Sequence, residues 1–354
     1  MSSFEVKVYP IELHPHENAD ALEIGRIPGQ DYQFVVRKGQ FVDGDLFVYI
    51  PEQAVLPQDL IEGMGLTGML HGSNKNRVKP IRLRGVLSQG LAHRPVVWPP
   101  DWELGMDVGD ELGITKYEPV VPTHLEGRVK PAPNLPRAPG GSLFQGYTDI
   151  DNIKKFRDVL QPGELVYVTE KLHGTCLLVG SLCGERVVSS LGLARRGYML
   201  EDDGNVYWET AKRYELHDKL EMMLKSKGCQ QGMIFGEIIG VQDLKYGHTD
   251  GQTSFQAFDL LLEESYGYQP YYEFLPRCLS YGIPTVPLLF IGPYAPDHIL
   301  SLTAGSSSLA DVRHVREGVV IRPAAERRHP ALGRVILKSI NPDYLTRKNG
   351  SEFH

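Results

Sequence analysis

The first 115 residues contain short apolar or alternating segments that predict β-strands rather than helices. The clearest segments cover Phe4–Tyr9, Tyr32–Val36 and Leu46–Ile50, and turn-forming residues such as Gly29 and Pro51 separate them. Strand patterns broken by glycine and proline in this way are typical of small all-β domains. We therefore expect residues 1–115 to form a small β-barrel.

The character of the chain changes after this region. A proline-rich stretch with few apolar residues favours an extended or irregular linker over 116–145. The remaining residues, 146–354, mix strand patterns with one helix predicted over Trp208–Lys227, which ends at Gly228. A length of 354 residues fits two domains. The first is predicted to be all-β, and the second to combine helices and strands.

Composition narrows the class of protein. Hydrophobic residues make up 42% of the chain and charged residues 23%, which is typical of globular proteins. No apolar run approaches the roughly 18 residues of a membrane helix, and the N-terminus lacks a secretory signal pattern. The four cysteines are scattered and form no CxxC pair. We expect a cytoplasmic protein with no membrane partner, and nothing in the sequence implies a protein partner.

The charge balance excludes one mode of nucleic-acid binding and leaves another open. With 37 basic against 44 acidic residues, the net charge is −7, so no basic footprint covers a whole domain. Basic residues do cluster locally, at 75–79 with Arg82 and Arg84, at 195–196 and at 327–328. Each cluster either neutralises phosphates or is a solvated surface loop, and the sequence leaves both interpretations open.

Two predicted strands carry lysines that do not belong in a core. The first covers Leu165–Thr175 and brings Lys171 to a glycine turn, and the second covers Arg334–Lys338. A lysine beside apolar strands has two common uses. It keeps its stem buried and its amine in water, or its pKa is lowered and it becomes a nucleophile.

Two further apolar strands carry isolated carboxylates. Glu237 lies within Gln231–Gly240, and Glu317 lies directly before a strand over residues 318–322. Because burial of an unpaired carboxylate is costly, each glutamate is expected at an open end of a sheet or facing a cation. Any one of these residues alone could be a partly exposed edge residue.

The four residues together predict a chemistry if they converge. Desolvation and the charge of Lys338 would lower the pKa of Lys171 and make its amine nucleophilic. Glu237 and Glu317 could hold hydrated Mg²⁺, which prefers oxygen ligands. Metal and lysine would neutralise charge on a phosphoryl group in transfer. This set predicts nucleotidyl transfer onto Lys171.

The same segments, in this order, resemble the motifs of covalent nucleotidyltransferases, the superfamily of DNA ligases, RNA ligases and mRNA capping enzymes. The matching segments are Lys171–Gly174 for motif I, Phe235–Glu237 for motif III, Phe255–Asp259 for motif IIIa, Glu317–Val320 for motif IV and Lys338 for motif V.

A longer segment narrows the resemblance. Residues Gly236–Gly247 are similar to a signature of nick-sealing RNA ligases of the Deinococcus and Naegleria type, which carry an OB-fold module before the catalytic domain. The resemblance implies an α+β fold with an N-terminal OB-like β-barrel over 1–115 and the linker over 116–145. A nucleotidyltransferase domain over 146–354 follows, similar to ATP-grasp ligases, with antiparallel sheets and flanking helices.

The resemblance also implies roles in binding ATP. Lys171 would become lysyl-AMP, and Glu170 would lie by the adenine. An aromatic side chain of motif IIIa, Phe255 rather than Phe258, would stack on the base. Lys338 would contact the α-phosphate.

The metal-binding and remaining roles follow from the same resemblance. Glu237 and Glu317 would engage the ribose or the waters of Mg²⁺ or Mn²⁺, the metals of the family. Arg195 is our assignment for the motif Ia arginine, and a plain surface position is the alternative. Two residues depart from the family pattern: His173 stands where most relatives have aspartate, and Ile336 replaces the first lysine of motif V.

These expectations give a main hypothesis and two alternatives. The protein is predicted to be an ATP-dependent RNA ligase that seals 3′-OH/5′-phosphate nicks through lysyl-AMP and 5′-adenylylated RNA. Its partner would be nicked duplex RNA or an RNA/DNA hybrid, which the OB-like domain would grip on the 3′-OH side. The alternatives are a DNA ligase or RNA-capping transferase, and an inactive nucleic-acid-binding relative.

Overall fold

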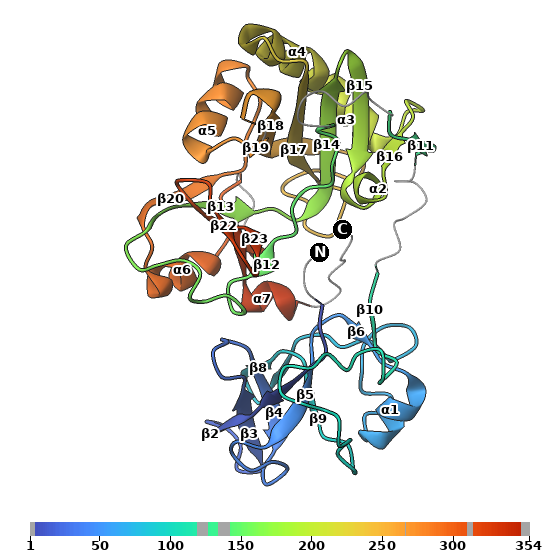
Figure 1. The fold of residues 1–354 in the computed structure, drawn as a ribbon, viewed down its shortest axis with the longest axis vertical. Coiled ribbons are helices and arrows are strands. Elements are labelled where there is room, and N and C mark those ends of the chain that lie inside the picture. Colours follow the sequence, from blue (N-terminus) through green and yellow to red (C-terminus); the bar gives the residue numbers. More distant parts are fainter. Residues whose placement is uncertain (1–3, 119–126, 134–141, 266, 310–313, 348–354) are drawn as a thin grey trace. The chain divides into compact units, whose positions relative to one another are not determined.

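The computed structural model describes residues 4–118, 127–133, 142–265, 267–309 and 314–347. The chain divides into two compact units (Figure 1). Unit 1 comprises residues 1–118, 151–158 and 345–347, and unit 2 comprises residues 119–150, 159–344 and 348–354. Within the predicted linker, residues 119–126 and 134–141 lie outside the described residues.

Unit 1 is built from short antiparallel strands, as the sequence pattern predicts. One sheet has the order β1-β5-β9 and another the order β2-β3-β4. The bounds are Lys7–Pro10 for β1, Glu12–Pro15 for β2, Leu22–Arg26 for β3, Gln33–Arg37 for β4, Leu46–Ile50 for β5 and Leu91–His93 for β9. The strand expected over Leu46–Ile50 is confirmed, whereas the one expected from Phe4 begins at Lys7.

Smaller elements complete unit 1. Its one helix longer than a turn is α1, Gln58–Gly63, within the described residues. Strand β6 (Ala54–Val55) pairs with β10 (Thr115–Lys116), and β7 (Ile81–Leu83) pairs with β8 (Val86–Ser88). Two apolar clusters form its core, one around Val8, Ile50 and Trp102 and the other around Phe34 and Phe47.

Unit 2 contains two larger antiparallel sheets. The first, sheet A, has the order β15-β14-β17-β18-β19, and the second, sheet B, contains the order β24-β21-β13-β20. The bounds for sheet A are Gly174–Leu182 for β14, Glu185–Ser190 for β15, Gln231–Ile239 for β17, Ser254–Leu262 for β18 and Gly267–Tyr268 for β19. Those for sheet B are Leu165–Lys171 for β13, Leu288–Pro293 for β20, Gly318–Pro323 for β21 and Leu337–Ile340 for β24.

Helices flank these sheets, and the predicted long helix is in fact two. Helix α3 covers Val206–Arg213 and α4 covers Leu216–Lys227. Between them Glu215 has a left-handed backbone with φ of 53°, which interrupts the helical hydrogen-bond ladder. The predicted end at Gly228 is confirmed, since this residue caps α4 with φ of 66°.

The other elements of the chain are short. They are β11 (Val129–Pro131), β12 (Asp151–Asn152), α2 (Leu191–Arg195), β16 (Tyr198–Leu200), α5 (Tyr271–Ser280), α6 (Pro296–Thr303), β22 (Arg328–His329), β23 (Gly333–Arg334) and α7 (Pro342–Leu345). Strand β11 lies in the predicted linker and pairs with β16, so part of that segment is regular. No helix among the described residues is long and apolar enough to cross a bilayer.

The two faces of sheet A differ in what covers them. Alternation of side chains along a strand sends Leu177, Ile234 and Phe255 into the core with α3 and α4. Leu178 and Phe235 belong to the opposite face. Val320 of β21 and Ile336 join the cluster on that second face. Sheet B therefore packs against sheet A on the face opposite to α3 and α4.

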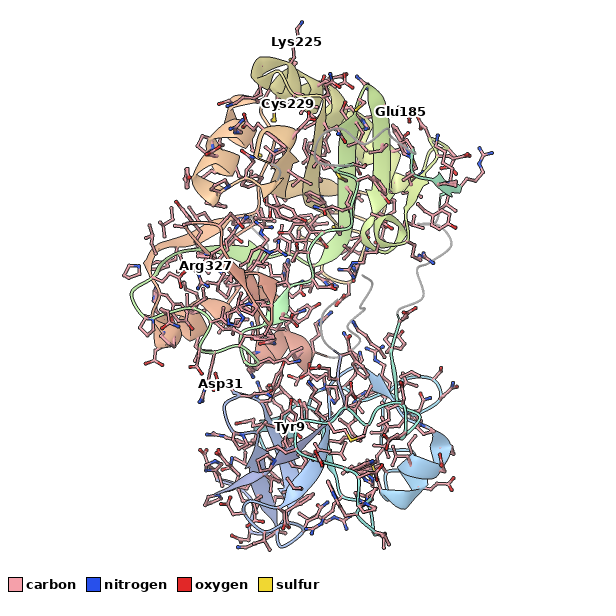
Figure 2. All side chains as sticks on the ribbon, viewed as in Figure 1. Tyr9, Asp31, Glu185, Lys225, Cys229 and Arg327 are labelled. Carbon is pink, nitrogen blue, oxygen red and sulfur yellow. The ribbon has the colours of Figure 1, made fainter. Side chains whose placement is uncertain are left out.

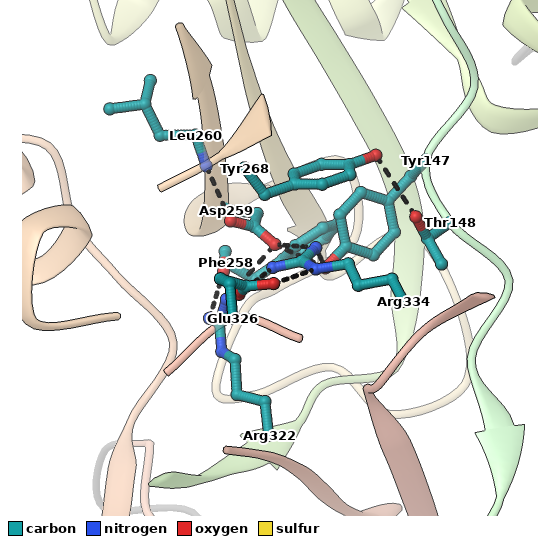
Figure 3. A network of polar contacts seen from close by, with 9 residues as sticks. All are labelled: Tyr147, Thr148, Phe258, Asp259, Leu260, Tyr268, Arg322, Glu326 and Arg334. Atoms are coloured by element: carbon teal, nitrogen blue, oxygen red, sulfur yellow. Dashed lines mark hydrogen bonds and ion pairs between the residues drawn. The ribbon is translucent and has the colours of Figure 1, made fainter. Parts of the chain in front are cut away.

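A buried network of charges ties the two sheets together (Figure 3). Asp259 on β18 accepts hydrogen bonds from Arg334 at 2.6 Å, from Arg322 at 3.2 Å and from the Tyr147 hydroxyl at 2.7 Å. Burial opposes the charge on Asp259, but the two guanidinium groups outweigh it and hold the pKa of the carboxyl below its ordinary value. Asp259 of motif IIIa is therefore bound by side chains that stabilise the fold.

Several predicted basic clusters have structural partners. Arg77 is buried and its guanidinium stacks 3.8 Å above the ring of Tyr117. Arg327, labelled in Figure 2, forms a bidentate pair with Glu164 at 2.7 and 2.8 Å. These two arginines stabilise the fold, so they are poor candidates for contacts with phosphates.

All four cysteines are free thiols.

Candidate active site

Lys171 ends β13 and its amine donates a hydrogen bond to Glu317. The Lys171 Nζ–Glu317 Oε1 distance is 2.6 Å. Lys171 lies opposite Gly318 in the β13–β21 register, so Glu317, the residue before β21, is delivered to the end of the same strand pair. A Cβ atom at Gly318 would lie 2.1 Å from the carbonyl oxygen of Ser339 on β24, and glycine lets that strand approach closely.

The charge state of Lys171 differs from the expectation. Burial disfavours its ammonium form, but attraction to Glu317 and Glu237 and the hydrogen bond to Glu317 outweigh burial and raise the pKa of the amine. The prediction of a lowered pKa is therefore wrong for this arrangement. The expectation that a buried glutamate faces a cation is met by Glu317, but the expected pKa of Lys171 did not include that contact.

Lys338 lies on the same face of sheet B as Lys171. It is opposite Val320 on β21, two residues along from Gly318, and residues directly opposite in antiparallel strands share a face. Strands are about 4.8 Å apart and rise about 3.4 Å per residue, so the two lysine Cα atoms lie roughly 12 Å apart. Their flexible four-carbon stems allow both amines to approach one group between them.

Glu237 reaches the site from sheet A. It lies opposite Cys176 in the β14–β17 register. It comes two residues after Phe235 and so shares the face of sheet A that packs on sheet B. Burial and the repulsion of Glu317 raise the pKa of Glu237 to about 8, although Lys171 opposes this shift. The structure therefore brings together Lys171, Glu237 and Glu317.

Cys176 is a residue of this site that the sequence did not indicate. Burial and the charge of Glu237 raise the pKa of its thiol, while Arg195 and Lys171 act in the opposite direction. A buried thiol with a raised pKa is a weak nucleophile. Its position two residues after Gly174 of motif I was the available sequence signal, whereas its place opposite Glu237 is set by the strand register.

Arg195 lies at the end of α2 beside the same site. Its charge acts on Cys176, and its side chain pairs with Asp149. The partly exposed guanidinium also contacts the carbonyl of Tyr147 at 3.4 Å. The position is thus at the margin of the site, and a role in binding nucleotide stays a prediction.

Glu170 points away from Lys171, because neighbouring residues in a strand face opposite sides. Its carboxylate is buried, accepts the backbone N–H of Ser308 at 2.7 Å and lies 3.7 Å from Nε of Arg316. Its other oxygen has no hydrogen-bond partner among the described residues. Glu170 therefore holds the segment that leads into motif IV, and its predicted contact with adenine stays a prediction.

Phe255 does not have the position that was expected. It is fully buried on the α3–α4 face of sheet A, with its ring 5.8 Å from that of Tyr214. Glu237 lies on the other face, so Phe255 cannot stack on a base held there. Gln256 lies opposite Glu237, so alternation along β18 puts the half-buried Phe258 on the Glu237 face. Phe258 is the better candidate of motif IIIa.

His173 is enclosed by polar groups. Its Nε2 lies 2.7 Å from Oδ1 of Asp243, and its Nδ1 lies 2.8 Å from the hydroxyl of Tyr344. Its backbone N–H donates to the Tyr246 hydroxyl at 2.8 Å. Asp243 and Tyr246 belong to the Gly236–Gly247 signature, but its pattern gave no sign that they would contact motif I.

A family model supplies the decisive comparison. The model described as RNA ligase matches residues 164–340, which span the Lys171, Glu237, Glu317 and Lys338 positions. This chain belongs to the RNA ligase family. A second model, described as an OB-fold domain, matches residues 7–96 and confirms the expected class of the N-terminal region. The comparison with curated proteins finds no significant match.

Solved structures agree with this assignment. A Naegleria gruberi RNA ligase with PPi is 24% identical, with a TM-score of 0.78 over 97% of this chain and 98% of that chain. A variant of the same ligase, in which one lysine is replaced by methionine, was solved with AMP and Mn. It is 23% identical, with a TM-score of 0.78 over 97% of this chain and 98% of that chain. At this identity the likeness shows the fold alone, over nearly the whole of both chains.

The carboxylates of this RNA ligase suit a hydrated divalent cation. Oε2 of Glu317 is buried and has no hydrogen-bond partner within the described ranges, and Glu237 is held near two other charged groups. No cluster of three or more His, Cys, Asp or Glu side chains arranged around one metal occurs in the described part of the chain. Two carboxylates suit an ion such as Mg²⁺, which prefers oxygen ligands and keeps several of its waters.

Proposed function

We propose that the protein is an ATP-dependent RNA ligase that seals 3′-OH/5′-phosphate nicks in duplex RNA or an RNA/DNA hybrid. The observation that carries this proposal is the pairing of Lys171 with Glu317 beside Glu237, within the segment that matches the RNA ligase family. A strand-end lysine surrounded by carboxylates suits phosphoryl chemistry, in which charge neutralisation and positioning dominate.

The first step would be attack of Lys171 on ATP. The Nζ–P bond forms at the α-phosphorus, the bond to the β-phosphate oxygen breaks, and pyrophosphate leaves with the electron pair. The ammonium must first lose its proton, and any group that draws Glu317 away from Lys171 would lower the pKa of the amine and favour that loss. Lys338 would contact the α-phosphate from the same face of sheet B.

The next two steps would use the bound adenylate. A 5′-phosphate oxygen of RNA attacks the phosphorus of lysyl-AMP, so the P–N bond breaks and the Lys171 amine is regenerated. The neighbouring 3′-OH then attacks the 5′-phosphate of adenylylated RNA, and AMP leaves as the strand is joined. Glu237 and Glu317 would hold Mg²⁺ or Mn²⁺, which supplies positive charge opposite the phosphates when bound.

The other site residues take supporting roles in this proposal. Phe258 would stack on the adenine in place of Phe255, and Arg195 would contact a phosphate. The OB module would grip the duplex, since OB folds present a groove to nucleic acid. Deletion of residues 1–115 is expected to weaken RNA affinity and nick sealing, and unchanged values of both would refute this role. A cytoplasmic location stays a prediction from the sequence.

Labelling with ATP tests the central claim. Incubation with α-³²P-ATP and Mg²⁺ is expected to give a labelled protein that keeps its label through denaturing gel electrophoresis. The Lys171→Ala variant should take up no label, while Lys212→Ala, which removes an exposed lysine, should label like the parent. Absence of label in the parent, or equal labelling of Lys171→Ala, contradicts the proposal.

A substrate panel separates the alternatives. Sealing of a nicked RNA strand with ATP supports the ligase, whereas label from GTP indicates a capping transferase. Sealing restricted to an all-DNA nick indicates a DNA ligase. Tight RNA binding without any label indicates an inactive relative.

A further inference from the structure

Unit 1 contains a stretch of chain whose charge is opposite to that of the whole protein. Residues 63–100 include six lysine and arginine residues and no aspartate or glutamate, whereas the whole chain has a net charge of −7. The six residues are Lys75, Arg77, Lys79, Arg82, Arg84 and Arg94. Arg77 is buried against Tyr117, but Arg82 and Arg84 are exposed on the hairpin of β7 and β8. This hairpin therefore carries positive charge at the surface of an acidic protein.

The hairpin is fixed to unit 1 at its base, beside β4 (Figure 1). The side-chain amide of Gln33 on β4 donates to the carbonyl of Leu87 at 3.0 Å. The backbone N–H of Val35 donates to the Ser88 hydroxyl at 3.0 Å. Leu87 and Ser88 are both buried. The base is thus part of the packed domain, and the hairpin has a fixed orientation within unit 1.

The tip of the hairpin, Arg84 and Gly85, is a two-residue turn. Leu83 pairs with Val86 on either side of it, and φ is 48° at Arg84 and 89° at Gly85. Positive φ at both positions is typical of a type I′ turn, which favours asparagine, aspartate or glycine. A left-handed backbone is uncommon for a long side chain. Backbone preference therefore does not account for Arg84, which points to a role for its guanidinium group.

Two residues of the segment after β2 hold the tip in place. The side-chain amide of Asn18 donates to the carbonyl of Arg84 at 3.2 Å, and Nε2 of His16 lies 3.2 Å from the carbonyl oxygen of Leu83. The backbone N–H of Asn18 donates to Nδ1 of His16 at 3.1 Å, so Nε2 carries the hydrogen that Leu83 accepts. These contacts engage backbone carbonyls of the hairpin and do not involve the Arg84 side chain.

The guanidinium group of Arg84 is exposed on this fixed backbone. It has no hydrogen bond or ion pair with any residue that the structure describes, and Glu17, between the two anchoring residues, does not pair with it. Arg82 brings a second guanidinium to the tip, because its Nη1 donates to the carbonyl of Gly85 at 3.3 Å. Two charged groups with several N–H donors each therefore lie at the tip.

We propose that the β7–β8 hairpin of the OB module binds the phosphate backbone of the RNA duplex, with Arg84 as the principal contact and Arg82 beside it. Guanidinium groups form bidentate hydrogen bonds with phosphate oxygens. Phosphate contacts position a protein on a duplex without reading its sequence. The proposal rests on the proposed ligase function, and it assigns the grip of the OB module to a named element.

Charge complementarity favours a nucleic acid as the partner. A protein with a net charge of −7 repels a polyanion over much of its surface, so a locally basic element decides which part meets the duplex. A two-residue tip is too small for a protein interface, which takes about 800 Å² from each partner. One guanidinium is enough for one phosphate.

Binding of a fluorescein-labelled nicked RNA duplex to the full-length protein tests the proposal. Anisotropy is measured with EDTA and without ATP, at salt concentrations between about 50 and 200 mM. Arg84→Asn removes the charge but introduces a residue that the turn favours, so the fold should persist. It should weaken binding about 10-fold and reduce the slope of log K against log salt by about one. The loss should be equal for two duplexes of different sequence, since a phosphate contact reads no bases.

Three further variants control this measurement. Arg84→Gly also suits the turn and should lose as much affinity as Arg84→Asn. Arg84→Lys keeps the charge and should retain most of the affinity and of the salt slope. Lys225→Gln makes the same change in net charge at an exposed position of α4 in unit 2 (Figure 2), and it should bind like the parent. Melting curves verify that each variant is folded.

The outcomes separate this role from that of a solvated surface hairpin. Parent-like affinity and salt slope of Arg84→Asn and Arg84→Gly overturn the proposal, as does a parent that does not bind the duplex. Equal losses in Lys225→Gln, or a loss in Arg84→Lys as large as in Arg84→Asn, also overturn it. A loss that differs between the two duplex sequences would indicate base contacts and overturn the assignment to phosphates. Failure of the parent to label with ATP refutes the ligase function but leaves this comparison of duplex affinities intact.

Discussion

The amine of Lys171 and the carboxylate of Glu317 form a 2.6 Å ion pair at the point where β13 ends and β21 begins. The pair fixes both the position and the charge of the proposed nucleophile. Because Glu317 raises the pKa of Lys171, the reaction requires that this carboxylate be engaged elsewhere when ATP binds.

Replacement of Glu317 by glutamine should impair the first step, because the lost charge that would hold a divalent cation outweighs the easier deprotonation of Lys171. The glutamine side chain would keep a hydrogen bond to Lys171 but would lose the charge offered to a cation. The rate of labelling by α-³²P-ATP is expected to fall by roughly 100-fold or more, typical for loss of one preorganised electrostatic group. Glu264→Gln, which removes a carboxylate paired with Lys227 away from the site, serves as the control. Labelling of Glu317→Gln at the parent rate would contradict this account.

Glu237 should make stability depend on pH. Its pKa rises on folding from 4.5 to about 8, so the native state binds a proton that the unfolded state releases between these values. The stabilisation is fully present below about pH 4.5 and is lost as pH rises through about 8.

Melting curves with EDTA at pH 5 to 8 test this prediction. The Tm of Glu237→Gln should be similar to that of the parent at pH 5 and higher than that of the parent at pH 8. Each kcal/mol of difference in unfolding free energy corresponds to about 2–4 °C in Tm. The exposed Glu185→Gln provides the comparison. A Tm difference between parent and Glu237→Gln that does not grow with pH would show that Glu237 is ionised in the fold.

The Asp259 network should be a major contributor to stability. Asp259→Asn would leave the buried guanidinium groups of Arg322 and Arg334 without their shared carboxylate. Removal of one partner from a buried ion pair typically destabilises a protein by about 3–5 kcal/mol. Glu221→Gln, in an exposed pair with Arg186, should cost about 1 kcal/mol or less. Equal costs in urea unfolding would argue against the network.

Gly174 should be intolerant of any side chain. A Cβ atom there would lie 2.1 Å from the carbonyl oxygen of Ile238, so alanine must push β14 away from β17. Overpacking of this kind costs about 1–3 kcal/mol, and the shift would also move Lys171 and reduce labelling. Gly192→Ala, in α2 with open space around it, should be neutral or stabilising by up to about 1 kcal/mol. Parent-like Tm and labelling of Gly174→Ala would contradict the close approach.

The sequence by itself determined the strand patterns and the order of the motifs. Strands β5 and β17 follow directly from their apolar runs, because periodicity is a local property of the chain. The identities of Lys171, Glu237 and Glu317 as members of one site also came from sequence, since each is a costly residue beside an apolar strand.

Only the tertiary structure decided how these residues interact. The register of β13 with β21 delivers Glu317 to Lys171 and reverses the expected shift in the pKa of its amine. The face of sheet A that packs on sheet B decides that Phe258 rather than Phe255 lies on the side of the site. The contact of His173 with Asp243 joins residues 70 positions apart. Strand register, sheet face and long-range contacts depend on how the whole chain packs, so no local pattern encodes them.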